Sequence, residues 1–212
     1  SVRFTGRVHE QPAHQFPVKN LTIHCRHDGY LPMLRDQKKG RNEYLLLTEL
    51  NEKPDDPYLH YQLGKEKEVD GDFSNALQAY RKSLLLIGSL FENWQHDLVL
   101  RSLFCMKKVK DFDNALELAQ RWQHTLEMIP DYHFVLGDLY LDMAFDNPAQ
   151  ADTLLPLIEA HWLRCLEIGE KPDIDGCVKG RGSTLAAHNL SVFYESIGVP
   201  DKAAFYKNLS MH

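Results

Sequence analysis

The residues best suited to bind a metal ion gather near the start of the chain. Residues 24–28 read His-Cys-Arg-His-Asp, and His9 and Glu10 precede them. Imidazole, thiolate and carboxylate groups are the usual protein ligands of zinc and similar ions. On a β-strand, however, His24 and Cys25 point to opposite faces, so both can bind one ion only if the backbone bends. A metal-binding domain built on this cluster is therefore the weakest of three functional hypotheses.

The rest of the sequence lacks the short motifs of common catalytic sites. It contains no phosphate-binding P-loop, no nucleophile elbow and no zinc-protease pattern. Later histidines and tryptophans fall on expected helices, where packing is their expected role: His60, His96, His124, His133, His161, His188, Trp94, Trp122 and Trp162. The four cysteines have no paired spacing, which predicts free thiols in a reducing cytoplasm: Cys25, Cys105, Cys165 and Cys177.

Composition argues against several classes of function. The 212 residues carry a net charge of −6, with 43% apolar and 25% charged residues, as ordinary soluble domains do. A negative balance without local basic clusters argues against nucleic-acid binding. No segment reaches the roughly 18 apolar residues that a membrane span needs. Because the chain begins at Ser1 rather than Met, we expect a piece of a longer protein.

The metal-binding candidates lie in an N-terminal segment that differs from the rest. Residues 2–8 and 18–24 have the character of short β-strands, joined by a connection rich in proline and glutamine. Two strands alone are marginal in water, so either residues 1–30 dock on the helices or they are the remnant of a larger domain whose sheet is missing. An unpaired strand edge at residues 2–8 would also favour self-association, for example as a homodimer.

From residue 31 onward the pattern is helical. Residues 31–56 read as a linker and a capping helix that stops at Pro54. In the following stretch, small and large apolar residues alternate at helical spacing, with Gly64 on a first helix and Ala76 and Tyr80 on a second. The Gly71-Asp72 pair between them is a turn signal. A small residue opposite a large one lets two helices approach closely, which predicts a helical hairpin.

The spacing of Gly64, Gly71, Phe73, Ala76 and Tyr80 resembles a tetratricopeptide repeat, whose unit is about 34 residues long. The resemblance implies an all-α fold, a right-handed superhelix of antiparallel helix pairs, preceded here by the short β-containing segment. Echoes of the pattern divide residues 57–212 into four repeats, at about 57–88, 91–129, 131–168 and 184–210. Residues 147–156 look like an insert in the third repeat, and residues 169–183 look like a long loop.

A second resemblance concerns the front of the chain. Gly-Arg-Val-His-Glu-Gln at 6–11, Ile-His at 23–24, His-Asp-Gly-Tyr at 27–30 and Lys-x-Arg-Asn at 39–42 occur in this order. The order is similar to the junction where bacterial family-two glycosyltransferases end their GT-A type catalytic domain and run into tetratricopeptide repeats. Such enzymes use a nucleotide-sugar and a divalent metal, manganese or magnesium. The resemblance implies that His9 binds this metal and that Glu10 orients His9.

The main hypothesis is therefore the C-terminal part of such a glycosyltransferase, inactive by itself because the nucleotide-binding units and the Asp-x-Asp metal motif lie upstream in that family. The alternative is a free-standing tetratricopeptide adaptor that binds a protein or peptide in its concave groove. In either case the family places first-helix residues in the groove: Tyr61, Lys65, Arg101, Val135 and Asp138. The Lys and Asn clamp that binds peptide carboxylates in one subtype of these proteins is absent.

Overall fold

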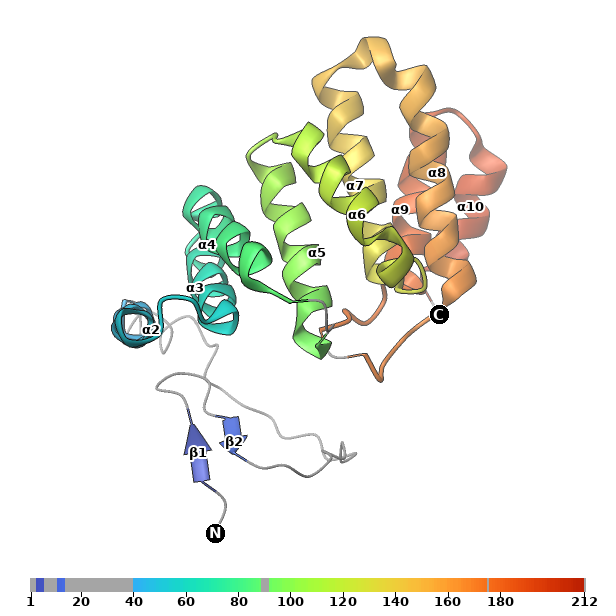
Figure 1. Cartoon of the computed structure of the whole chain (residues 1–212). Helices are drawn as coiled ribbons and strands as arrows, with labels where there is room; N and C mark the ends of the chain where they lie inside the picture. Colours follow the sequence, from blue (N-terminus) through green and yellow to red (C-terminus); the bar gives the residue numbers. More distant parts are fainter. Residues whose placement is uncertain (1–2, 6–10, 14–39, 89–91, 175, 212) are drawn as a thin grey trace. The chain divides into compact units, whose positions relative to one another are not determined.

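The computed structural model describes residues 3–5, 11–13, 40–88, 92–174 and 176–211. These residues form nine α-helices, one 3-10 helix and one pair of short strands (Figure 1). The chain divides into two compact units, residues 1–87 and residues 88–212, and each is described by itself. The division falls within the region 57–212 that the sequence assigns to repeats, and the boundaries of the repeats stay predictions.

The strands of the first unit differ in part from the sequence prediction. β1 (Arg3–Thr5) pairs antiparallel with β2 (Gln11–Ala13). The predicted strand at residues 2–8 therefore exists in part and has a partner on one edge. Its partner, Gln11–Ala13, lies in the segment that the sequence predicts to be a connection. The other predicted strand, 18–24, lies outside the described residues. Self-association through a strand edge stays a prediction.

The helices of the first unit begin and end at recognisable signals. They are α2 (Arg41–Glu52), α3 (Pro57–Val69) and α4 (Phe73–Leu86). The Asp56 carboxylate accepts hydrogen bonds from the first backbone N–H groups of α3, at 2.9 and 3.2 Å, and Pro57 occupies the first helical position. Between α3 and α4, Gly71 has a φ of 77°, which favours glycine.

The packing of α3 on α4 depends on a small residue facing a large one, as the sequence predicts. A Cβ atom on Gly64 would lie well inside van der Waals contact with the ring of Tyr80. That ring is fully buried, and its hydroxyl donates to Glu68 Oε2 at 2.7 Å. Farther along α4, Ser83 Oγ donates to the Pro57 carbonyl at 2.7 Å. The close approach therefore buries an aromatic ring and satisfies polar groups at the same interface.

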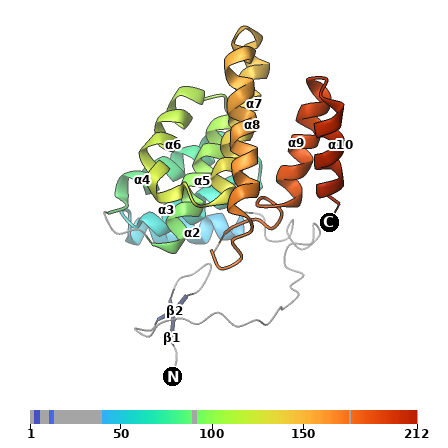
Figure 2. The same cartoon turned by 90° about the vertical axis from the view of Figure 1, so that its right-hand side faces the viewer.

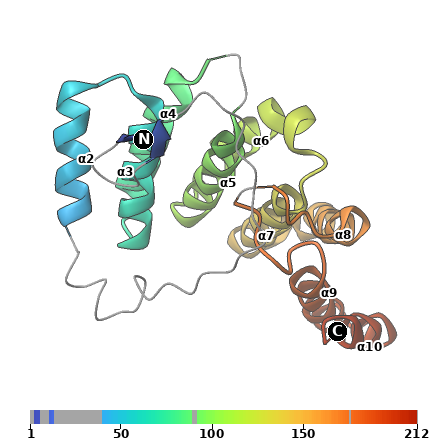
Figure 3. The same cartoon turned by 90° about the horizontal axis from the view of Figure 1, so that it is seen from below.

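The second unit consists of three helical hairpins. In each one, two helices joined by a short connection lie side by side (Figure 2). The helices are α5 (Asn93–Lys108), α6 (Phe112–Leu126), α7 (Pro130–Asp146), α8 (Ala151–Ile168), α9 (Thr184–Ser196) and α10 (Pro200–Leu209). Seen from below, the ends of α7, α8 and α9 lie next to one another, so neighbouring hairpins share a core (Figure 3).

The middle hairpin corrects one expectation. Residues 147–156 look like an insert in the sequence, but after the 3-10 helix η2 (Pro148–Gln150) the helix α8 already covers the rest of them. Pro156 lies inside α8 and removes one helical hydrogen bond. Leu154 and Ile158, on either side of it, are 5% and 0% exposed. Burial of this apolar face outweighs the local cost of the proline, so the helix continues through it.

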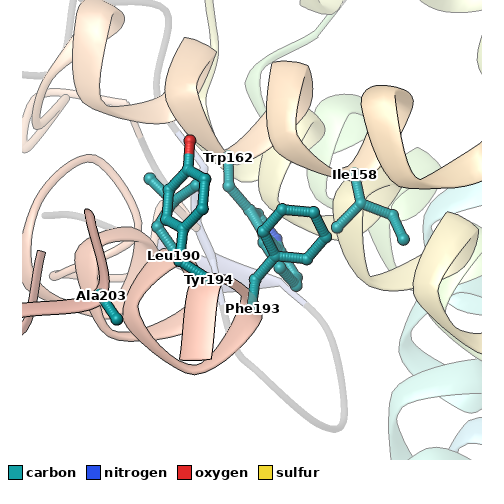
Figure 4. Close-up of a cluster of buried hydrophobic side chains, with 6 residues drawn as sticks. All are labelled: Ile158, Trp162, Leu190, Phe193, Tyr194 and Ala203. Carbon is teal, nitrogen blue, oxygen red and sulfur yellow. The ribbon is translucent and has the colours of Figure 1, made fainter. Parts of the chain in front are cut away.

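A cluster of buried side chains joins the last two hairpins (Figure 4). Ile158 and Trp162 come from α8, and they meet side chains of α9 and α10: Leu190, Phe193, Tyr194 and Ala203. The Trp162 indole lies directly against Gly137 of α7, where a Cβ atom would overlap it. Gly137 and Trp162 therefore repeat, in the second unit, the contact that Gly64 and Tyr80 make in the first.

We predict that Gly64→Ala lowers the free energy of unfolding by about 1–2 kcal/mol. Alanine is a better helix former than glycine by about 1 kcal/mol, but overlap with the Tyr80 ring costs more. Chemical denaturation of the full chain measures the change. Ser74→Ala, at an exposed position of α4, is the matched control and should stay within about 0.5 kcal/mol of the parent. Adding Tyr80→Leu should reduce the cost of the Gly64 substitution, and equal costs in both backgrounds would contradict the contact.

Candidate functional site

Two of the predicted groove residues, Tyr61 and Lys65, lie on α3 in the first unit. Tyr61 is only 4% exposed, and its ring centroid lies 5.8 Å from that of Tyr58 and 6.4 Å from that of Tyr80. The Lys65 ammonium lies 5.2 Å from the centre of the Tyr61 ring, a cation–π contact. Tyr61 is therefore a buried packing residue, whereas Lys65, which contacts its ring, is more accessible to solvent.

The other three predicted groove residues belong to the second unit and have different surroundings. Val135 is 5% exposed and packs inside the unit. Arg101 is half-buried, and its Nε donates to Asp97 Oδ2 at 2.6 Å, one turn earlier on α5. Asp138 lies between two other first helices, with Lys107 Nζ of α5 3.7 Å away and Asn189 Nδ2 of α9 donating at 3.3 Å. Burial raises the pKa of Asp138, and the nearby Lys107 opposes this shift.

Asp138 is the first member of an acidic row along α7. Asp142 and Asp146 follow at intervals of one helical turn. Lys107 also lies 3.7 Å from Asp142, and Lys110 forms an ion pair with Asp146. Asp142, Asp146 and the two lysines border a hollow of about 270 Å³ beside Phe145, whose side chain is 77% exposed. The four-residue spacing of this row is present in the sequence, and of its members only Asp138 is predicted to be a groove residue.

The long loop at residues 169–183 is held to the helices by a buried carboxylate. Asp131, in the first turn of α7, is 0% exposed. Its Oδ1 accepts from the Val178 backbone N–H at 3.0 Å and from Arg181 Nη1 at 2.8 Å. The Arg181 guanidinium also lies 5.1 Å from the centre of the Phe134 ring. An ion pair buried on one side and a backbone hydrogen bond thus fix the middle of the loop.

The two ends of the same loop are also tied together. The Glu170 carboxylate accepts from the Gly180 N–H at 2.9 Å and from the Ser183 hydroxyl at 2.6 Å. Gly182 approaches the backbone of Gly169 so closely that a Cβ atom on Gly182 would overlap it. A loop whose ends meet and whose interior is bonded to the body of the protein has the character of an Ω-loop.

A larger cavity, of about 640 Å³, opens between α6, α7 and α8. Its volume lies in the range of small-molecule binding sites. Apolar and polar side chains both line it. The lining residues of α6 are Leu116, Ala119, Gln120 and Gln123, and Glu127, which follows α6, also lines the cavity. Those of α7 and α8 are Tyr132, His133, Leu136, Tyr140, Ala160, His161 and Arg164.

Two histidines meet head-on in the wall of this cavity. The Nδ1 atoms of His133 and His161 are 2.9 Å apart. The ring centroids are 5.2 Å apart with an interplanar angle of 30°, so the rings meet edge to edge rather than face to face. The nitrogens point directly at each other, which is the geometry of an N–H···N hydrogen bond. A metal ion bound by both nitrogens would need them to converge at an angle instead.

The proton positions in this pair follow from its other contacts. His133 Nε2 lies 2.9 Å from the Glu127 carbonyl oxygen, which can only accept, so Nε2 carries a proton. In neutral His133 the Nδ1 atom is then an acceptor, and His161 Nδ1 must donate to it. Neutral His161 is left with a lone pair on Nε2. The ring of Tyr140 stacks on that of His161, with centroids 5.5 Å apart.

Burial keeps both imidazoles neutral at pH 7. It lowers the pKa of His161 from 6.5 to about 4, and the neighbouring His133 acts in the same direction. It also lowers the pKa of His133, although the hydrogen bond to Glu127 opposes the shift. Nothing in the sequence pairs these residues, because they stand 28 positions apart on different helices. Each one alone reads as a packing histidine.

The predicted catalytic remnant cannot be placed. His9, Glu10 and the cluster at 24–28 lie outside the described residues, so the metal role of His9 stays a prediction. Within the parts of the chain that the structure covers, no three or more His, Cys, Asp or Glu side chains gather to hold a metal ion. In the same parts, no helix has the length and apolar character needed to cross a membrane.

We predict that Asp131→Ala releases the loop at residues 169–183. The substitution leaves the Val178 N–H and the Arg181 guanidinium without their shared acceptor, at a cost of about 2 kcal/mol. Hydrogen exchange of the full chain should show the Val178 amide exchanging at least about tenfold faster. Asp173→Ala, at an exposed position of the same loop, should leave it protected. Equal protection in both variants would contradict the role of Asp131.

We also predict that acid destabilises the second unit through His161. The pKa of His161 is 6.5 when unfolded and about 4 when folded, so the unfolded chain binds more protons between these values. The stabilisation from neutral His161 is therefore complete above about pH 6.5 and is lost as the pH falls toward 4. Because the group is partly exposed, we expect the free energy of unfolding to fall by about 2 kcal/mol across this range. Chemical denaturation at several pH values between 4 and 6.5 measures this dependence. The free energy of unfolding should vary less with pH in His161→Gln than in the parent. It should vary as in the parent in His124→Gln, a substitution at an exposed position of α6.

No protein-family model and no curated protein matches this chain. Solved structures are similar to it. A MamA structure from Desulfovibrio magneticus RS-1 superposes with a TM-score of 0.63 and 17% identity, over 84% of this chain and 86% of that one. YrrB, described as a TPR protein with an unusual peptide-binding site, gives a TM-score of 0.54 and 16% identity, over 84% and 78%. A human IFIT1 dimer structure gives 0.57 and 16%, over 80% and 36%. The chain therefore has the helical-repeat fold of tetratricopeptide proteins.

Proposed function

We propose that this chain is a tetratricopeptide scaffold that binds a protein segment along the first helices of its hairpins. This is the alternative named from the sequence, and the fold supports it because stacked helical hairpins present extended surfaces for partners. YrrB, which shares the fold, is described as having a peptide-binding site. The right-handed superhelix and the continuous groove expected from the repeats stay predictions.

The observation that carries the proposal is the surface around Phe145 on α7. An aromatic side chain that is 77% exposed stands next to a hollow bordered by Lys108, Lys110 and Asp142. Exposed aromatic residues at the centre of a patch, surrounded by polar groups, often dominate the energy of protein interfaces. Asp138, a predicted groove residue, lies on the same face of α7, four residues before Asp142 and seven before Phe145.

The glycosyltransferase parent has less support. None of the similar structures named above is described as a glycosyltransferase, and most residues that carry that resemblance lie outside the described part of the chain, apart from Gln11 in β2 and Arg41 and Asn42 at the start of α2. The codons upstream of Ser1 provide a direct test. An α/β segment with an Asp-x-Asp motif there would support a parent enzyme that uses manganese or magnesium and a nucleotide-sugar, and an immediate start codon would exclude it.

Binding by the surface around Phe145 can be tested with a pair of matched variants. The full chain is immobilised to capture partners from an extract of its own organism, and a captured partner is then purified for calorimetry. We predict that Phe145→Ala weakens its binding at least about tenfold, which corresponds to about 1.4 kcal/mol. Phe205→Ala removes another aromatic side chain, which is 62% exposed on α10, and should leave the affinity unchanged. Equal affinities for both variants would exclude the surface around Phe145.

A further inference from the structure

We propose that the cavity between α6, α7 and α8 binds an aliphatic ammonium group, which donates a hydrogen bond to His161 Nε2. The cavity, of about 640 Å³, is larger than such a group and its alkyl chain require. Its lining is distinct from the surface around Phe145, so the proposal does not rest on the proposed function. Free amines and lysine side chains of a partner share this chemistry.

The acceptor in the cavity is fixed by the chain itself. The Glu127 carbonyl sets the proton of His133, and His133 sets the proton of His161, so the Nε2 atom of neutral His161 presents a lone pair. Histidines in binding sites are commonly oriented in this way by a hydrogen bond at the other ring nitrogen. Within the described residues, no side chain or backbone group donates to His161 Nε2. A ligand that brings an N–H group therefore completes the set of hydrogen bonds.

The hydrogen-bonding groups of the histidine pair favour a ligand that donates over one that accepts. Arg164, the basic residue of the cavity lining, donates from Nη1 to Glu167 Oε2 at 3.0 Å, and the exposed Glu127 also lines the cavity. A carboxylate ligand has no proton to donate to the lone pair of His161. An ammonium group brings the donor that this acceptor requires.

The tyrosines in the wall add no charge to the cavity. The Tyr132 hydroxyl donates to the Ala119 carbonyl at 3.0 Å, and burial raises the pKa of Tyr132 to about 12. Burial also raises the pKa of Tyr140, whose ring covers one face of His161. Both phenols are therefore neutral at pH 7, at which binding is measured. Leu116 and Leu136 supply apolar surface for the alkyl chain of a ligand.

The proposal is tested with n-butylammonium and with butyrate, which have similar alkyl chains and opposite charges. Two-dimensional NMR of the full chain follows the imidazole and cavity resonances during titration at pH 7. We expect saturable binding of butylammonium with a dissociation constant of roughly 1–10 mM, as is usual for so small a ligand, and at least about tenfold weaker binding of butyrate. Equal binding of both compounds, or binding of neither, would overturn the proposal.

Two variants locate the site. His161→Phe keeps an aromatic ring beside Tyr140 but removes the acceptor, and should weaken butylammonium binding about tenfold. His124→Phe, on the exposed part of α6, should bind as the parent does. If His161→Phe fails to fold, titration of the parent protein decides the question through the imidazole nitrogen-15 shifts. A donated hydrogen bond moves the Nε2 signal of His161, and a signal that stays in place at saturation refutes the assignment.

A peptide distinguishes the two sources of the ammonium group. Acetyl-Ala-Ala-Lys-Ala-Ala-amide binding at least as tightly as butylammonium, through the same His161 resonances, assigns the cavity to a partner's lysine. Binding of butylammonium without binding of the peptide assigns it to a free amine. Either result upholds an ammonium site, because both require the same acceptor.

Discussion

The structure depends on the close approach of paired helices, which a glycine permits where a large aromatic ring must fit. Gly64 faces Tyr80 in the first unit, and Gly137 faces Trp162 in the second. In both places a single methyl group would overlap the ring. Since cores are packed nearly as densely as crystals, the ring or the helix must shift to relieve such an overlap. In the first unit the same close interface includes the hydrogen bonds from Tyr80 to Glu68 and from Ser83 to the Pro57 carbonyl.

Close packing makes the hydrogen bonds of buried polar groups important in the second unit. A buried carboxylate or imidazole is costly unless its hydrogen bonds are made. Asp131 meets this requirement at Oδ1, which binds the loop at residues 169–183, whereas its buried Oδ2 has no hydrogen-bond partner among the described residues. His133 and His161 meet it by binding each other. In this pair only His161 Nε2 has no hydrogen-bond partner among the described residues, and His161 lines a cavity.

The two proposed sites would serve different kinds of recognition within one small unit. The surface around Phe145 is exposed, aromatic and bordered by charges of both signs, which suits a protein partner. The cavity beside His161 is recessed and offers a fixed acceptor, which suits a single chemical group. Both depend on α7, because one face of this helix carries the acidic row and another carries His133 and Tyr140. A helix that packs on neighbours along its length can still present two different sites.

The sequence by itself determined the helical hairpins, because helical periodicity and the pairing of small with large residues are local patterns. The contact of Gly64 with Tyr80 could be predicted in this way. Only the tertiary structure decided that α8 runs through Pro156, because the burial of Leu154 and Ile158 outweighs the local preference of proline. The histidine pair was likewise decided by the fold. Its partners lie on different helices, and no local pattern records which side chains two packed helices bring within hydrogen-bond distance.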